Sequence, residues 1–277
     1  MFDYHIHTKY CNHAVGTMEE YVQAAIDKNL SEMGFACHMP FELMPSEVPR
    51  EEYAMSLHTL NSTYFPEIER LQQKYKHQIT IKTGLEIDYC QWIQQPIDEF
   101  IDKYSHRLDY ILGSVHILKS NDIVWGIDDH RFSHIFNEIG VDVVYQQYIN
   151  ALENLVKSGK YTILAHLDLP KKYGFHPTNR TWYLNRIELL LDLINDNHMG
   201  IECSTGGLRK HIGEIYPEEQ IIKIAIQKGI PLITSSDAHN PNEVAYNFPE
   251  LYSYLKRLGL THLTSYNAKK KSLIEIS

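Results

Sequence analysis

Short apolar runs alternate with longer amphipathic segments along the whole chain. The runs are rich in Ile, Leu and Val, as in strands buried on both faces, and the segments between them have helical spacing. We expect strands at residues 2–7, 33–38, 79–86, 108–116, 161–166, 199–203 and 230–237. Seven strand–helix units predict a parallel sheet covered by helices, and the lack of a linker-like stretch favours one domain over residues 1–277.

Capping residues and prolines indicate where the helices begin and end. Thr17 and Glu20 form a capping box, which predicts a helix start. Pro66 is expected to interrupt a long helix, and Pro217 is expected in the first turn of a later one. The expected helices cover about residues 17–28, 54–75, 141–157, 183–195, 217–228 and 249–258.

Nearly every expected strand ends in a histidine or a carboxylate. In a closed barrel these ends converge on one mouth, whereas the outer strands of an open sheet lie too far apart to share a site. The chain has no GxGxxG after its first strand and no GxxxxGK[ST], so a nucleotide-binding open sheet lacks its usual motifs. The pattern therefore favours a barrel with its active site at the carboxyl ends of the strands.

The first strand shows how such a site is built. His5 and His7 point to the same face because side chains alternate along a strand, and His13 follows after a short turn. The full set of strand-end candidates is His5, His7, His13, His38, Glu86, His116, His166, Asp237 and His239. Imidazole and carboxylate together suit zinc, manganese or iron, and this many ligands would serve two or three ions. A multinuclear site of this kind usually hydrolyses phosphate esters.

The reaction places demands on further residues. Two ions bridged by Glu86 would lower the pKa of a shared water, so that hydroxide attacks phosphorus in line near neutral pH. A guanidinium or ammonium would neutralise charge that develops on the phosphate. Arg209 is the first candidate, Lys171 and Lys172 the second, and Arg180 and Arg186 the third.

Other residues are candidates for proton transfer and for substrate recognition. His239 or Asp168 could protonate the leaving alkoxide, and Asp168 could instead orient an imidazole. His176 and His211 follow the fifth and sixth strands and remain open as site residues. A cationic substrate would need an acidic partner near the mouth, for which the candidates are Glu42, Asp128, Asp129 and Glu202.

Composition and charge exclude several classes of partner. The net charge of −9 and the lack of a basic stripe argue against nucleic acid. No run approaches the roughly 18 to 20 apolar residues of a membrane span, and the N-terminus does not have the pattern of a signal peptide. Four scattered cysteines suit reduced thiols. We therefore expect a cytoplasmic protein with a small-molecule substrate.

The successive strand-end motifs resemble those of the polymerase and histidinol phosphatase (PHP) superfamily. The resemblance extends over almost the whole chain and rests on His5-x-His7, His13, His38, Gly84-Leu85-Glu86, Gly113-Ser114-Val115-His116, Ala165-His166-x-Asp168 and Ser236-Asp237-Ala238-His239. It implies a distorted (β/α)7 barrel with three metal positions. The implied ligands are His5, His7, Glu86 and Asp237 for the first position, Glu86, His116 and His166 for the second, and His13, His38 and His239 for the third.

One segment narrows the resemblance. Residues 201–210, followed by Ile215-Tyr216-Pro217, are similar to a segment typical of histidinol-phosphate phosphatases, with Ser204 and Gly206 where that family usually has Asn and Ala. The resemblance therefore implies hydrolysis of L-histidinol phosphate in histidine biosynthesis. Two alternatives remain open: another phosphomonoester, such as a nucleotide or phosphotyrosine, and a nuclease or accessory domain associated with a polymerase.

Overall fold

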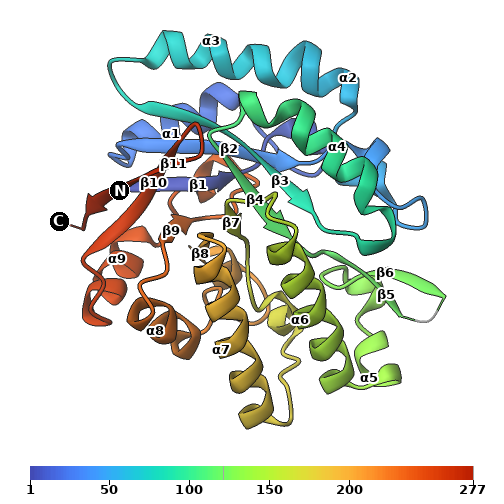
Figure 1. The fold of residues 1–277 in the computed structure, drawn as a ribbon. Coiled ribbons are helices and arrows are strands. Elements are labelled where there is room, and N and C mark those ends of the chain that lie inside the picture. The colour runs from blue at the N-terminus through green and yellow to red at the C-terminus, as the bar shows by residue number, and fades with distance from the viewer. Residues whose placement is uncertain (121, 277) are drawn as a thin grey trace.

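A parallel sheet of seven strands curves into a nearly closed barrel in the computed structural model, which describes residues 1–120 and 122–276 (Figure 1). The strands, in sheet order, are β1 (Phe2–Ile6), β2 (Glu32–His38), β3 (Thr80–Asp88), β4 (Tyr110–Ser114), β7 (Ile163–Leu164), β8 (Gly200–Ser204) and β9 (Leu232–Ser235). Each neighbouring pair within the sheet is parallel. The predicted (β/α)7 barrel is therefore confirmed.

Closure of the barrel joins the first and last strands at the mouth. The backbone N–H of His7 donates to the carbonyl oxygen of Ala238 at 2.9 Å, and the N–H of Ala238 donates to His5 at 3.2 Å. The expected strand at residues 108–116 is shorter than predicted, and β7 has only two residues. His116 and His166 consequently lie just beyond their strands, where the backbone is free of the ladder and can turn toward the mouth.

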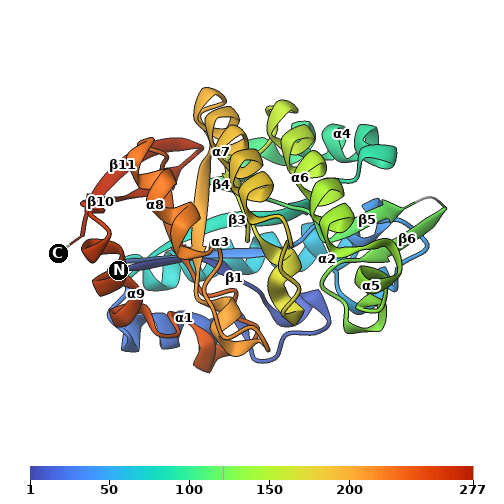
Figure 2. The ribbon, with the colours of Figure 1, turned by 90° about the horizontal axis from the view of Figure 1, so that it is seen from below.

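Helices cover the outside of the barrel, and α6 and α7 run side by side (Figures 1 and 2). The longer helices are α1 (Met18–Asp27), α3 (Phe65–Tyr75), α4 (Gln94–Tyr104), α6 (Val141–Lys157), α7 (Arg180–Asp196), α8 (Glu219–Gln227) and α9 (Phe248–Arg257); α2 (Leu57–Thr59) and α5 (Ile135–Ile139) are short. The capping box at Thr17 is confirmed, because its side chain accepts from the N–H of Glu20 while the Glu20 carboxylate accepts from the N–H of Thr17.

The two proline predictions had different outcomes. The long helix is interrupted next to Pro66 as predicted, because a π-helical turn at residues 60–64 separates α2 from α3 and Pro66 lies in the first turn of α3. Pro217 precedes α8, whose N-cap is Glu218, so its predicted place in the first turn was wrong. Among the described residues, the helices are all too short or too polar to traverse a lipid bilayer.

Two hairpins and helices α4 and α5 were absent from the sequence prediction. Hairpin β5 (Ile117–Ser120) and β6 (Ile123–Gly126) follows β4 at the mouth side. Hairpin β10 (His262–Asn267) and β11 (Lys270–Glu275) lies beside both termini (Figure 2). β5 and β6 are short, β11 is mostly exposed, and β10 is buried but polar in sequence, so none of them has the continuous apolar run that marked the sheet.

Candidate metal centre

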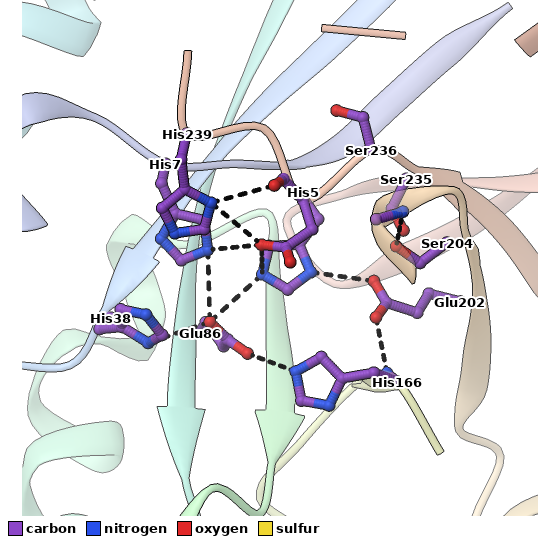
Figure 3. A network of polar contacts seen from close by, with 12 residues as sticks. His5, His7, His38, Glu86, His166, Glu202, Ser204, Ser235, Ser236 and His239 are labelled. Atoms are coloured by element: carbon purple, nitrogen blue, oxygen red, sulfur yellow. Dashed lines mark hydrogen bonds and ion pairs between the residues drawn. The ribbon is translucent and has the colours of Figure 1, made fainter. Parts of the chain in front are cut away.

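Glu86 lies at the centre of the mouth and is surrounded by five imidazoles from four different segments. Its register is fixed by β2, since His38 is paired with Glu86 in the parallel ladder. Oε2 of Glu86 lies 3.0 Å from His38, 3.2 Å from His5 and 3.5 Å from His7, and Oε1 lies 2.9 Å from His166 and 3.4 Å from His116. Figure 3 shows His5, His7, His38 and His166 directed at this carboxylate.

Asp237 forms a second centre beside the first. Its Oδ1 lies 3.3 Å from Nε2 of His7 and 3.5 Å from Nδ1 of His239. Nε2 of His239 in turn lies 2.8 Å from Nε2 of His13. The structure therefore brings all nine strand-end candidates together, and we call these nine side chains the floor of the site.

Most of the floor imidazoles are held in place through the ring nitrogen that faces away from Glu86 and Asp237. His5 Nδ1 lies 3.0 Å from Glu202, and His116 Nδ1 lies 2.9 Å from Asp88. Cys11 serves two rings, with its carbonyl oxygen 2.7 Å from Nδ1 of His13 and its Sγ 3.4 Å from Nδ1 of His7. Outer partners of this kind fix the tautomer and the orientation of imidazoles that ligate metals.

The ring nitrogens that point toward Glu86 and Asp237, which we call the inward nitrogens, are arranged for metal coordination and not for hydrogen bonding. Within the described residues, His5 Nε2, His7 Nε2 and His38 Nδ1 are buried and lie 3.0 to 3.3 Å from a carboxylate oxygen of Glu86 or Asp237, but none of them makes a hydrogen bond of good geometry. Buried polar atoms normally have partners, so a shared cation accounts for these orphans. Three donor triads have atoms within 4.8 Å of one another and are built from floor residues alone, namely His7, His38 and His239; His5, His7 and Asp237; and His38, Glu86 and His116.

The electrostatics of the floor balance burial against pairing. Burial opposes ionisation of Glu86 and Asp237, but the surrounding imidazoles outweigh it and hold both pKa values well below their usual range. Burial lowers the pKa of His116, yet Asp88 and Glu86 raise it overall to about 10. For His7, burial is likewise outweighed, by Cys11 and Asp237, and the pKa rises to about 9. Without ions, the floor is a network of paired charges.

A cavity of about 420 Å³ opens above the floor. Residues of two further segments, 44–53 and 126–132, line the cavity together with residues of the floor. Lys172 lines this cavity, and its Nζ lies 2.9 Å from the carboxylate of Asp128, which lines it too. We call Lys172 and Asp128 the rim pair.

Arg209 and Lys171 lie differently from Lys172. Neither is among the residues that line the cavity. The Arg209 guanidinium donates to the backbone oxygens of Ser236 and Asp237, both at 2.9 Å, and so supports the segment that carries Asp237. Lys171 is buried, with its Nζ 2.9 Å from Asp168. Arg180 and Arg186 form ion pairs with Glu218 and Glu153.

The remaining candidates divide between the cavity and its surroundings. Asp129 lines the cavity together with Asp128, whereas His176 and His211 are exposed and do not line it. Glu42 accepts from the N–H of Leu57 near the start of α2. Glu202 lies behind the floor, between His5 Nδ1 and the N–H of His166 (Figure 3). Glu202 is therefore an orienting group instead of a substrate partner.

Sequence reasoning missed Asp88 and Cys11 as orienting groups. Asp88 lies two residues after Glu86 on β3, so strand alternation places it on the same face as Glu86. That spacing was a usable signal for Asp88. No comparable signal existed for Cys11, because its role depends on how the turn after β1 folds.

The backbone of the floor is unusual at Asp237. Asp237 has φ 52°, in the left-handed region that most residues avoid. Gly206 packs against it, and a Cβ at Gly206 would lie 2.9 Å from the Cβ of Asp237 and 3.2 Å from its Oδ2. The glycine at position 206, which departs from the alanine expected there, therefore gives the Asp237 carboxylate room.

Comparisons with known proteins agree with this geometry. Residues 3–206 match the family model described as "PHP domain". A Deinococcus radiodurans protein named "Probable histidinol-phosphatase" is 32% identical over 93% of this chain and 93% of its own length. The Bacillus subtilis "Histidinol-phosphatase" is 32% identical over 89% of this chain and 96% of its own.

A solved structure has the same fold. It is a histidinol phosphate phosphatase from Lactococcus lactis, complexed with zinc, L-histidinol and phosphate, with a TM-score of 0.80, 20% identity and 98% coverage of both chains. At this identity the likeness shows a shared barrel fold alone. Membership of a family follows instead from the family model, which matches residues 3–206, and from the Deinococcus radiodurans relative, which is 32% identical over 93% of this chain. This chain therefore belongs to the PHP family.

Proposed function

We propose that this chain is a metal-dependent phosphatase that hydrolyses L-histidinol phosphate to L-histidinol and phosphate. The observation that carries the proposal is the Glu86 carboxylate inside a shell of five imidazoles, three of which have buried inward nitrogens without hydrogen bonds. The names of the relatives, and the zinc, L-histidinol and phosphate in the Lactococcus lactis structure, identify the substrate.

The floor would hold two or three ions of zinc, manganese or iron. His5, His7, Glu86 and Asp237 would hold the first, with Glu86 shared by a second ion on His116 and His166. His13, His38 and His239 would hold the third. When bound, such ions lower the pKa of water toward neutrality and neutralise charge on phosphoryl oxygens.

Residues of the cavity would bind the rest of the substrate. Lys172 is our candidate for binding a phosphate oxygen, because it lines the cavity together with floor residues and its only carboxylate partner among the described residues there is Asp128. Asp128 would then lose its ion pair with Lys172, and a cationic group of the substrate would take the place of Lys172. Arg209 remains a candidate for the phosphate, and its contacts with Ser236 and Asp237 support a positioning role.

His239 is the better placed of the two candidates for protonating the leaving alkoxide. It lines the cavity, whereas Asp168 is buried outside it and accepts from Glu218 and Lys171. Asp168 would also need to release Lys171 before it could act on a substrate. His239 could not donate a proton while its ring ligates the third ion, and burial holds its pKa well below the usual value, so we leave the proton donor unassigned.

We also propose one domain and a cytoplasmic location. A single cluster of buried hydrophobic residues extends from Phe2 to Ile276, which supports one folding unit. All four cysteines are buried free thiols, which supports a reducing compartment.

A panel of phosphate esters tests the proposed function. Protein purified without chelator would be analysed for metals by mass spectrometry and offered histidinol phosphate, a nucleotide, phosphotyrosine and p-nitrophenyl phosphate. We expect kcat/KM for histidinol phosphate to exceed the others by at least about 100-fold, as differential recognition of a charged substrate allows. A value no better than that for p-nitrophenyl phosphate would reject histidinol phosphate as the substrate and leave a general phosphomonoesterase.

A further inference from the structure

Tyr216 is a cavity residue to which neither the floor nor the rim pair gives a role. Its backbone is fixed against β8, since its N–H donates to Ser204 at 2.9 Å and its carbonyl accepts from Ser204 at 2.6 Å. The ring is held equally firmly, because a Cβ at Gly207 would lie 2.8 Å from it. Tyr216 is 3% exposed and lines the cavity above the floor.

The hydroxyl of Tyr216 has no partner. Across the described residues, its Oη is one of the few buried side-chain oxygens that make no hydrogen bond. A buried Tyr hydroxyl usually finds a partner, and leaving one unmade costs free energy. Lys171 does not supply the bond, because its ammonium lies over the ring, 5.4 Å from the centroid. A rigid, unsatisfied donor beside a cavity indicates a ligand atom as its missing acceptor.

The surroundings of Tyr216 indicate which ligand atom that is. Burial raises the pKa of Tyr216 well above its usual value, and the carboxylates of Asp168, Asp237 and Asp128 add to the increase. The hydroxyl therefore keeps its proton and can donate at any working pH. Asp237 belongs to the floor and Asp128 to the rim pair, so the hydroxyl lies within electrostatic reach of both. A phosphoryl group held between the floor and Lys172 would offer an oxygen there.

We propose that the Tyr216 hydroxyl donates a hydrogen bond to a phosphoryl oxygen of the bound phosphate monoester. This inference rests on the proposed phosphatase function and adds a binding residue that is independent of the metal ligands. The hydroxyl donates without transferring its proton, so no bond to it forms or breaks. Because the phosphoryl oxygens carry negative charge in the substrate and in the loose transition state, the bond would hold both.

Tyr216→Phe tests the inference, because it removes the hydroxyl and keeps the ring that packs on Gly207. We expect kcat/KM for histidinol phosphate to fall by about 10- to 100-fold, the scale of one hydrogen bond to a charged acceptor. Inorganic phosphate, titrated calorimetrically or as a product inhibitor, should bind more weakly by a similar factor. Metal content and melting temperature should stay at wild-type values.

Tyr266→Phe is the matched control. Tyr266 on β10 also has a buried Oη without a hydrogen bond within the described residues, but it does not line the cavity. We expect that variant to keep wild-type kcat/KM and phosphate affinity. The inference fails if Tyr216→Phe binds phosphate and turns over substrate within twofold of wild type, or if its loss of activity follows a loss of metal.

The same measurements separate this inference from the proposed substrate. If the wild-type protein hydrolyses several esters equally and Tyr216→Phe still binds inorganic phosphate more weakly, the hydroxyl contact stands and histidinol phosphate is rejected. If the wild-type protein prefers histidinol phosphate and Tyr216→Phe changes neither phosphate affinity nor turnover, the substrate stands and the contact is rejected.

Discussion

The floor, which is largely buried, and the rim pair, which is half-buried, differ in how their charges are compensated. On the floor, the rings of His5 and His7 are held through Nδ1 by Glu202 and Cys11, and their Nε2 atoms make no hydrogen bond within the described residues. At the rim, Lys172 and Asp128 already neutralise each other at 2.9 Å. The floor is therefore arranged to accept cations, whereas the rim must exchange one partner for another. This difference predicts that changes to the floor affect metal content and that changes to the rim affect substrate affinity.

Glu86→Gln should have the largest effect, because Glu86 contacts five floor imidazoles. We expect kcat/KM to fall by about 10³-fold or more, since several kcal/mol of charge stabilisation are lost. Bound metal, measured by mass spectrometry, should fall with it. Glu138→Gln on the exposed face of α5 is the control and should change neither quantity. A Glu86→Gln protein with full metal content and activity would refute the central place of this carboxylate.

Removal of an orienting carboxylate should have the next largest effect. Glu202→Gln and Asp88→Asn each weaken the hold on one ring, His5 or His116, while the ring itself stays in place. Losses of about 10- to 100-fold in metal affinity are expected for such outer partners. Metal titrations followed by activity would measure them. Equal affinity in both variants and in wild type would mean that packing alone orients the rings.

The two neighbouring lysines offer a sharper test of the rim. Lys172→Met should raise KM about tenfold with unchanged metal content, because a charge-assisted bond to phosphate is lost. Lys171→Met should instead lower stability by about 3 kcal/mol, because Asp168 is left buried and unpaired. Steady-state kinetics and chemical denaturation would separate the two. The contrast between floor and rim breaks down if Lys172→Met loses metal while KM stays unchanged.

The smallest expected effect is the release of protons from His7 and His116 when metal binds. The pKa values of about 9 for His7 and about 10 for His116 mean that both rings carry protons near neutral pH without ions, and both must lose them to bind metal. Calorimetry in buffers of different ionisation enthalpy should detect this release. Metal affinity should therefore rise as the pH rises toward these values. No dependence on the buffer would show that the rings are already neutral.

The same raised pKa values predict a stability trend for the metal-free protein. The contribution of His7 and His116 is complete below the unfolded pKa of about 6.5 and is lost as the pH rises through their folded values of about 9 and about 10. The melting temperature of chelator-treated protein should therefore fall between neutral and alkaline pH. The metal-loaded protein should show a smaller fall there.

The floor could be predicted from the sequence because its residues sit at strand ends, where the parallel barrel dictates convergence. His5, Glu86 and Asp237 come from distant parts of the chain, yet one architectural rule brings them together. The core strands could also be predicted, since their apolar runs are short but continuous. Hairpin β10 and β11 was missed because its second strand is largely exposed and shows no apolar run.

The surroundings of the floor could not be predicted in the same way. Arg209 and Lys172 both follow strands on the mouth side, but only the folded loops determine that one supports a backbone and the other lines the cavity. Glu202 is a comparable case, because its distance to His5 depends on the curvature of the sheet. Loop geometry and sheet curvature arise from many weak contacts, which residue spacing does not encode.

The left-handed backbone conformation of Asp237 decides which substitution can measure the contribution of its carboxylate to metal binding. An alanine there would remove the carboxylate and also adopt a dihedral angle that costs about 1 to 2 kcal/mol. Asparagine occupies that region more readily than alanine does and preserves the shape of the side chain. An alanine scan would therefore overstate the importance of the charge at this position, and the difference between the two replacements would report the energy stored in the main chain.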